Sequence, residues 1–498
     1  MAVGAERRER GPAMNNDRRK GSRLSRLAAA ALALAATSLV ACGVGPDYVR
    51  PTTEVPPAYK ETASWKVARP ADTAAKGLWW SAFGDPVLDG LQAQVNLNNQ
   101  NIAAAEARLR QARAQMLASR AGFFPSLTAG ASYTEAVRSQ NSISGGSLSG
   151  AELSDHLINF QVSWELDLWG KIRRGVEASE ASAQASASDL EAARLSAQAD
   201  LSQAYFQLRA LDSQTQLMDQ TLVTYRQFLE LTKNRYAGGL ASMADVAQAE
   251  TQLKSTQAQS VDLGIQRAQL EHAVALLLGK PASGFSLPRQ PLSATLPVIP
   301  PGLPSQLLER RPDVAGAERR VAAANAQIGV AEAAFFPSLT LSAAGGYESS
   351  LLGDLLKWPS RFWSVGPSLA QSVFDAGLRR AQAEGAQAAY DATVATYRQT
   401  VLTAFKEAED NIASLRILEE EAKVQAEALA ASRRSVEITT NQYKAGVTGY
   451  LNVLTAQTAL LTIERNAVDI AGRRMVASVL LVKALGGGWG EIKGGPAQ

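Results

Sequence analysis

The chain of 498 residues contains two copies of one sequence pattern. Residues 123–127, Phe-Phe-Pro-Ser-Leu, return as residues 335–339 at an offset of 212. A second set of residues recurs at an offset of 207: Asn234, Tyr236, Gly239, Val246 and Leu278-Gly279 become Asn441, Tyr443, Gly446, Val453 and Leu485-Gly486. Two sets of matches at nearly one offset indicate a duplicated unit of about 190 residues, so the fold is expected to contain one supersecondary pattern twice.

In each copy a helical pattern stops at the proline of this motif, and an alternating pattern begins. The alternation is sharpest from Ile158 to Leu168, where every second residue is apolar. Such a strand places all its apolar side chains on one face. Strands are predicted at about 126–137, 157–168, 338–348 and 362–373. They fit either a half-buried sheet of a soluble sandwich or the wall of a transmembrane barrel with a polar lumen.

The rest of each copy is predicted to be helical. One broken helical pattern, opened by Trp79, Trp80 and Pro86, continues to about residue 122. The long helices are expected at the following ranges: about 170–236, 241–279, 376–444 and 448–486. A helix of about 65 residues would be near 100 Å long. Because its apolar residues alternate with Ala, Ser, Thr and Gln, such a helix packs sideways through small residues.

The N-terminus has the pattern of a lipoprotein signal peptide, assigned to residues 1–41. Basic residues between Arg18 and Arg26 precede an apolar run from Leu27 to Ala36, and Met14 is an alternative start. Residues 39–43, Leu-Val-Ala-Cys-Gly, resemble a bacterial lipobox. Cys42 is the only cysteine, so we expect it to be acylated rather than paired in a disulfide. Residues 42–86 are predicted to form an acylated N-terminal arm.

Charge and motif content exclude several classes of function. Residues 1–41 hold eight Lys/Arg and three Asp/Glu, so the net charge of +3 becomes −2 in the remainder, and no basic patch suggests nucleic acid. The two histidines, His156 and His272, have no metal-ligand spacing, and no phosphate-binding glycine motif is present. We therefore expect no enzyme, no cofactor and no metal site.

Segments along almost the whole chain after Cys42 resemble the TolC-like outer-membrane efflux channels, in particular the lipoprotein branch that serves resistance-nodulation-division pumps. The most specific segment is 310–314, Arg-Arg-Pro-Asp-Val. The other matching segments are 79–86, 303–305, 324–329, 336–337 and 441–457.

The resemblance implies an α+β membrane protein with a tandem helix–strand–strand–helix repeat. Repeat 1 spans 87–280 and repeat 2 spans 305–486, joined by a linker at 281–304 and followed by a tail at 487–498. Four strands cannot close a barrel alone, whereas a homotrimer would form a 12-stranded barrel in outer-membrane lipid. The long helices would form a periplasmic coiled-coil tunnel. The implied partners are a periplasmic adaptor and, through it, an inner-membrane pump.

The resemblance also places a gate where the helix pairs turn, around Gly239 and Gly446. Leu451, Asn452 and Thr455 are expected at the constriction. Asp245 either bonds near Tyr443 as a latch or caps the helix that follows Ser242, and the residues alone leave both open. Positions 452 and 455 are commonly acidic in the family, and position 448 commonly carries a basic latch residue. Here these residues are Asn452, Thr455 and Thr448, so cation block by a carboxylate ring is not expected.

These features predict a passive exit duct of a tripartite efflux pump in the outer membrane of a Gram-negative bacterium, reaching into the periplasm. The same duct could serve type I protein secretion or metal efflux. An alternative of another class is a periplasmic adaptor or structural coiled-coil lipoprotein without a pore. The four strands with a polar second face favour the duct.

Overall fold

The computed structural model describes residues 43–53, 55–56, 59–60, 78–137, 139, 152–293, 296–297, 299 and 310–487. The predicted signal peptide, Cys42, and the tail after residue 487 lie outside the described residues. The chain forms two compact units, and each unit contains parts of both repeats. Of the described residues, those within 43–48, 116–179 and 323–390 belong to the first unit, and those within 49–115, 180–322 and 391–487 belong to the second.

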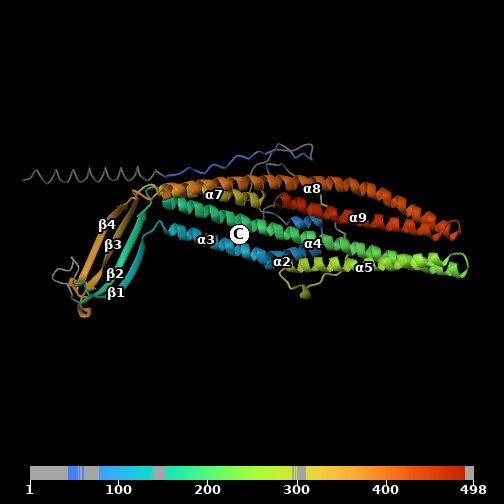
Figure 1. Cartoon of the computed structure of the whole chain (residues 1–498), viewed down its shortest axis with the longest axis horizontal. Coiled ribbons are helices and arrows are strands. Elements are labelled where there is room, and N and C mark those ends of the chain that lie inside the picture. The colour runs from blue at the N-terminus through green and yellow to red at the C-terminus, as the bar shows by residue number, and fades with distance from the viewer. Residues whose placement is uncertain are drawn as a thin grey trace, which may run out of the picture. The chain divides into compact units, whose positions relative to one another are not determined.

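The first unit contains a four-stranded antiparallel sheet in the order β1-β2-β3-β4 (Figure 1). The strands are β1 (Ser126–Val137), β2 (Glu152–Leu166), β3 (Ser338–Ser349) and β4 (Arg361–Ala370). All four predicted strands are present. The prediction was wrong about the start of β2, because its ladder with β1 continues through the polar residues to the pair Glu152–Val137. β4 ends before its predicted limit, and it accommodates Pro367 because it is an edge strand.

The strand register separates an apolar face from a polar face. One row across the four strands consists of Leu127, Val162, Ala343 and Val365. The neighbouring row consists of Thr128, Gln161, Ala344 and Ser364. Because successive strand residues point to opposite faces, one side of the sheet is apolar and the other carries hydroxyl and amide groups.

The repeated Phe-Phe-Pro motif lies at the corner where helix changes to strand. Helices α3 (Gln100–Ala121) and α7 (Pro312–Ala333) end just before the two motifs. The Trp169 ring stacks on Phe336 with 4.8 Å between ring centroids, and its indole N–H donates to the Pro337 carbonyl at 2.7 Å. The Trp164 indole donates to the Phe123 carbonyl at 3.0 Å. Aromatic side chains therefore hold both corners.

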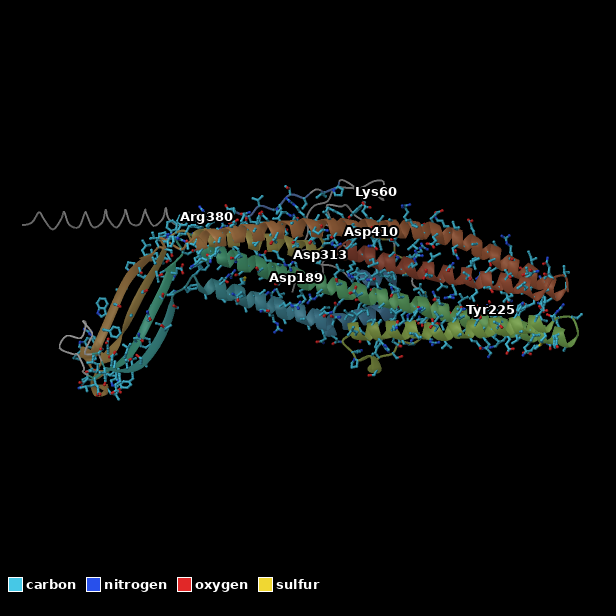
Figure 2. All side chains as sticks on the ribbon, in the orientation of Figure 1. Lys60, Asp189, Tyr225, Asp313, Arg380 and Asp410 are labelled. Carbon is cyan, nitrogen blue, oxygen red and sulfur yellow. The ribbon has the colours of Figure 1, made fainter. Side chains whose placement is uncertain are left out.

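The arm after Cys42 is fixed to the first unit by its backbone. The Val44 N–H donates to the Trp169 carbonyl at 3.1 Å, and the Arg174 guanidinium donates to the carbonyls of Val44 and Gly45 and to Asp47. Within the second unit, the Lys60 N–H donates to Glu409 on helix α8 (Leu378–Lys444) at 2.6 Å, and Figure 2 labels Lys60 beside Asp410 of that helix. The described residues of the arm are thus extended and bound, as a segment without its own core must be.

The long helices are α4 (Lys171–Ala237), α5 (Met243–Leu277), α8 (Leu378–Lys444) and α9 (Tyr450–Ala484). The first long helical pattern is two helices, α2 (Pro86–Asn98) and α3, preceded by a short 3₁₀ turn η1 (Trp79–Phe83). Within the described part of the chain, no helix has an apolar stretch long enough to cross a membrane.

The unpredicted break between α2 and α3 lies where α5 ends. Asn99 caps α3 through the N–H groups of Asn101 and Ile102, and its amide donates to the Leu277 carbonyl at 2.8 Å. Gly279 ends α5 with φ of 65°, and a Cβ added there would lie 2.3 Å from the Asn98 carbonyl oxygen. The Leu-Gly element of the repeat is therefore a joint between two helix ends.

The second repeat contains the same joint with different chemistry. Arg311, at the start of α7, donates to the Ala484 carbonyl at the end of α9 and pairs with Asp313 and Glu407. A Cβ on Gly486 would lie 2.7 Å from the Arg310 carbonyl oxygen. The family-specific stretch 310–314 thus includes the arginine that joins these helix ends.

Replacing Gly279 with alanine should destabilise the second unit by about 3 kcal/mol. The substitution combines left-handed backbone strain with overlap at a backbone oxygen that cannot move freely. Gly239→Ala is the matched control, because Gly239 has φ of 72° but nothing within 4 Å of the added Cβ. Urea unfolding should show the larger loss for Gly279→Ala, and equal losses would contradict the joint.

Candidate functional site at the helix turns

The two long helix pairs turn at glycines in a left-handed conformation, and both turns lie at the same end of the second unit (Figure 1). In the α4–α5 turn, the Leu240 N–H donates to the Arg235 carbonyl and Gly239 donates to Tyr236. The α8–α9 turn repeats this pattern with Val447 and Gly446. Both are Schellman endings, which require a residue with positive φ. The predicted turns at Gly239 and Gly446 therefore have the same local cause, a glycine with positive φ that follows the first helix of each pair.

Two tyrosines of the second turn are buried against the first helix pair. Tyr443 is 3% exposed and Tyr450 is 2% exposed, in a cluster with Leu229, Val246 and Val453. Figure 2 labels Tyr225, another member, at this end of α4. The equivalent positions in the first repeat, Tyr236 and Met243, are exposed. The two copies of the turn therefore have different surroundings.

Arg235, in the last turn of α4, connects the two turns through polar contacts. Its guanidinium donates to the Lys444 carbonyl at 3.1 Å, and its central carbon lies 4.8 Å from the centroid of the Tyr443 ring. The Tyr443 hydroxyl lies 3.4 Å from that of Thr232. A cation over an aromatic face and a cation at a helix C-terminus are both favourable. No sequence pattern predicts this role for Arg235, whose only local signal is a basic residue near the end of a helix.

Asp245 caps α5 rather than bonding to Tyr443. Its carboxylate accepts from the backbone N–H and the hydroxyl of Ser242 at 2.9 and 3.0 Å, and its own N–H donates to the Ser242 hydroxyl at 3.2 Å. This is a complete capping box, which uses the carboxylate locally. Of the two hypotheses for Asp245, the structure contains the cap, and the residue in contact with Tyr443 is Arg235.

The three residues expected at the constriction lie on the first turns of α9. Leu451 is 59% exposed, and Asn452 and Thr455 are also exposed, on the side of the helix away from buried Val453. The Asn452 amide donates to the Thr448 hydroxyl, and the Thr455 hydroxyl donates to the Leu451 carbonyl at 2.9 Å. The structure thus brings these side chains together as one uncharged patch with an apolar tip.

Burial favours the protonated form of two tyrosines of this cluster, Tyr450 and Tyr225. Burial raises the pKa of Tyr450 to about 12, with smaller contributions from Tyr225, Tyr443 and Asp245. Burial also raises the pKa of Tyr225, whose hydroxyl accepts from Gln252 at 3.4 Å. The hydroxyl groups of Tyr450 and Tyr225 therefore keep their protons at ordinary pH. Among the described residues, no group of His, Cys, Asp and Glu could hold a metal ion.

Comparison with known proteins identifies the family. The family described as "Outer membrane efflux protein" matches residues 91–280 and 303–487. The chain is 32% identical to the pyoverdine export outer membrane protein OpmQ of Pseudomonas aeruginosa, covering 92% of this chain and 97% of that protein. It is 33% identical to the outer membrane protein OprJ of the same organism, covering 92% and 95%.

Comparison of the fold with solved structures also finds outer-membrane channels. The structure of the outer-membrane channel OprN superimposes with a TM-score of 0.82 at 32% identity, covering 90% of this chain and all of that one. These similarities confirm the predicted fold class, the outer-membrane location and the efflux function, and the family is one of channels rather than enzymes. The chain belongs to the outer membrane efflux protein family and is a TolC-like outer-membrane efflux channel of a Gram-negative bacterium.

Proposed function

We propose that three copies of the chain form the passive exit duct of a tripartite efflux pump. The observation that carries this proposal is the open four-stranded sheet with one apolar and one polar face. Within the described residues, β1 and β4 each pair with a single strand, so each has an edge whose backbone N–H and C=O groups lack a strand partner. In lipid those edges must pair, and three sheets of four strands provide a closed barrel. The two ranges matched by the family model, 91–280 and 303–487, correspond to the two sequence repeats.

The pump and its adaptor supply the energy and select the cargo. A lumen lined by the hydroxyl and amide groups of the polar face offers water-like contacts to many solutes, which suits drugs and other small molecules. Protein and metal export would use the same duct with a different pump. Purified protein should migrate as a heat-resistant trimer and conduct ions in planar bilayers, and a non-conducting monomer would overturn the duct.

We further propose that the helix turns form its gate. Arg235, Tyr443 and Lys444 hold the two helix pairs of one chain together. With the pairs held, Leu451, Asn452 and Thr455 line the constriction, and the turns at Gly239 and Gly446 face the adaptor. Three copies of an apolar Leu451 tip restrict ion passage by excluding water.

Placing a carboxylate at the constriction should create cation block. Asn452→Asp introduces a ring of three negative charges, which should bind divalent cations and lower conductance when Mg²⁺ is added. Asn452→Gln controls for side-chain size and should remain insensitive to Mg²⁺. Planar-bilayer recordings check this expectation. Equal responses of the two variants would place residue 452 away from the pore.

The lipid anchor is tested separately. Cys42→Ser should abolish incorporation of labelled palmitate while leaving trimer assembly intact, because a closed barrel holds the membrane without an acyl chain. Labelling cells with palmitate measures acylation of the wild-type protein and of Cys42→Ser. Unlabelled wild-type protein would contradict acylation at Cys42, and labelled Cys42→Ser would move the modification elsewhere.

A further inference from the structure

Aromatic and basic side chains gather on the apolar face of the sheet at the end away from the helices. Tyr133 and His156 face each other across β1 and β2, and their rings stack at 4.7 Å. Tyr347 and Arg361 face each other across β3 and β4. Together with Trp358 of the β3–β4 loop, these five residues are called the loop-end belt. Its position matches that of aromatic side chains at a membrane–water boundary.

The β3–β4 loop extends this face with exposed apolar side chains. Leu351, Leu352, Leu356 and Trp358 are between 62% and 72% exposed. The loop is nevertheless ordered by two 3₁₀ turns, η4 (Leu352–Asp354) and η5 (Trp358–Ser360), and by Leu355, which is 6% exposed. A loop that presents several large apolar groups around one buried leucine indicates a surface that contacts a partner.

Arg361 determines on which side of the sheet Trp358 lies. The central carbon of its guanidinium is 3.6 Å from the Trp358 ring centroid. Arg361 and Trp363 are two residues apart on β4, so both point to the apolar face. Trp358 therefore continues the apolar wall of the sheet, and does not cover the polar face that would line the lumen.

Arg361 has no ion-pair partner within the part of the chain that the structure describes. Among the described residues, no carboxylate forms an ion pair with Arg361, whereas Lys357, the other cation of this loop, pairs with Asp354. A guanidinium on a lipid-facing wall is unfavourable unless an anion meets it. Stacking on Trp358 leaves the N–H edge of the guanidinium available for a planar, bidentate contact with phosphate.

We propose that the loop-end belt binds a phosphorylated glycolipid of the lipid A type in the outward-facing leaflet. Arg361 contacts a phosphate, Trp358 and Tyr347 lie at the headgroup level, and Trp363, nearer the middle of the sheet on the same face, contacts the acyl chains. This inference rests on the proposed duct, which places the helix end of the sheet toward the periplasm and the loop end toward the outside. The competing partner for the Arg361 guanidinium is the Glu135 carboxylate on the edge strand β1 of a second copy of the chain.

Native mass spectrometry of detergent-solubilised trimer titrated with purified lipid A tests the proposal. Arg361→Gln should lower the affinity for lipid A about tenfold, the effect of losing one charge-assisted contact. Trp358→Phe should lower it less, because the ring is retained. Titration with phosphatidylglycerol distinguishes recognition of the glycolipid phosphates from a general preference for anionic lipid, and wild-type protein that bound both equally would overturn the glycolipid assignment.

Glu135→Gln distinguishes lipid from a second copy. If Arg361 meets lipid, this variant binds lipid A as wild type does. Equal loss of trimer stability in Arg361→Gln and Glu135→Gln without any lipid would overturn the proposal in favour of the subunit contact. Undiminished lipid A binding by Arg361→Gln would also overturn it. Planar-bilayer conductance is measured on the same preparations, so that failure of the lipid site is distinguished from failure of the duct.

Discussion

Replacing Arg235 with alanine should leave the channel open at its helix turns. The substitution removes the hydrogen bond to the Lys444 carbonyl and the cation above the Tyr443 ring. Together these contacts contribute about 2 kcal/mol at a partly buried site. A loss of that size shifts the ratio of open to closed channels about 30-fold. Cells producing Arg235→Ala should therefore become sensitive to large antibiotics that the outer membrane normally excludes.

Two further variants on α4 make this test specific. Arg226→Ala removes an exposed arginine of α4 and should leave antibiotic sensitivity unchanged. Arg235→Lys keeps the charge but loses the planar guanidinium, so it should be intermediate. Sensitivity that rises equally for Arg226→Ala and Arg235→Ala would reflect loss of surface charge and would contradict a latch.

The largest loss of stability is expected for Asp212→Ala. The Asp212 side chain is 1% exposed and pairs with Arg209 at 3.2 Å and with Arg267 at 2.8 Å. It also accepts from the Gln290 N–H of the linker at 3.0 Å. Removing the carboxylate leaves two buried guanidinium groups without their shared anion, which typically costs about 3–5 kcal/mol. Thermal or urea unfolding of the purified protein measures this loss.

The same cluster attaches the linker to the helices. Arg209 donates to the Pro288 carbonyl and Arg267 donates to the Leu287 carbonyl at 2.7 Å, while the Leu287 N–H donates to Glu271. Asp212→Ala should therefore also increase proteolytic cleavage within the linker. The control is Asp200→Ala on the same helix, whose partner Lys483 lies 3.3 Å away in an exposed pair. Exposed pairs contribute about 1 kcal/mol or less, so comparable losses for the two variants would contradict a buried cluster.

The sequence predicts elements whose signal is local and periodic. Alternation in residues 158–168 indicates a strand, and the glycines at 239 and 446 mark helix turns, because each depends only on near neighbours. The break at Asn99 is not visible in this way. Polar residues 98–101 interrupt the apolar stripe without a proline or glycine, and the cause of the break is a contact with Leu277, which is distant in the chain.

The residues of the candidate site also divide into those that local sequence predicts and those that depend on distant contacts. Asp245 has a strong local partner in Ser242, and local capping geometry decides its role over the distant tyrosine. Arg235 bonds a residue that is 209 positions away, so no local pattern distinguishes it from any basic residue at a helix end. The early start of β2 is also a pairing effect, because polar residues from Glu152 join the sheet through their partners on β1.

A double-mutant cycle at Arg235 and Tyr443 tests the gate most directly. Tyr443→Leu keeps an apolar side chain in the cluster but removes the ring that faces the guanidinium. Single-channel recordings in planar bilayers give the open probability of wild type, Arg235→Ala, Tyr443→Leu and the double variant. If the two residues form one latch, each single variant opens the channel and the double variant opens it little further. Additive effects, or an unchanged open probability in Arg235→Ala, would contradict a gate held by this contact.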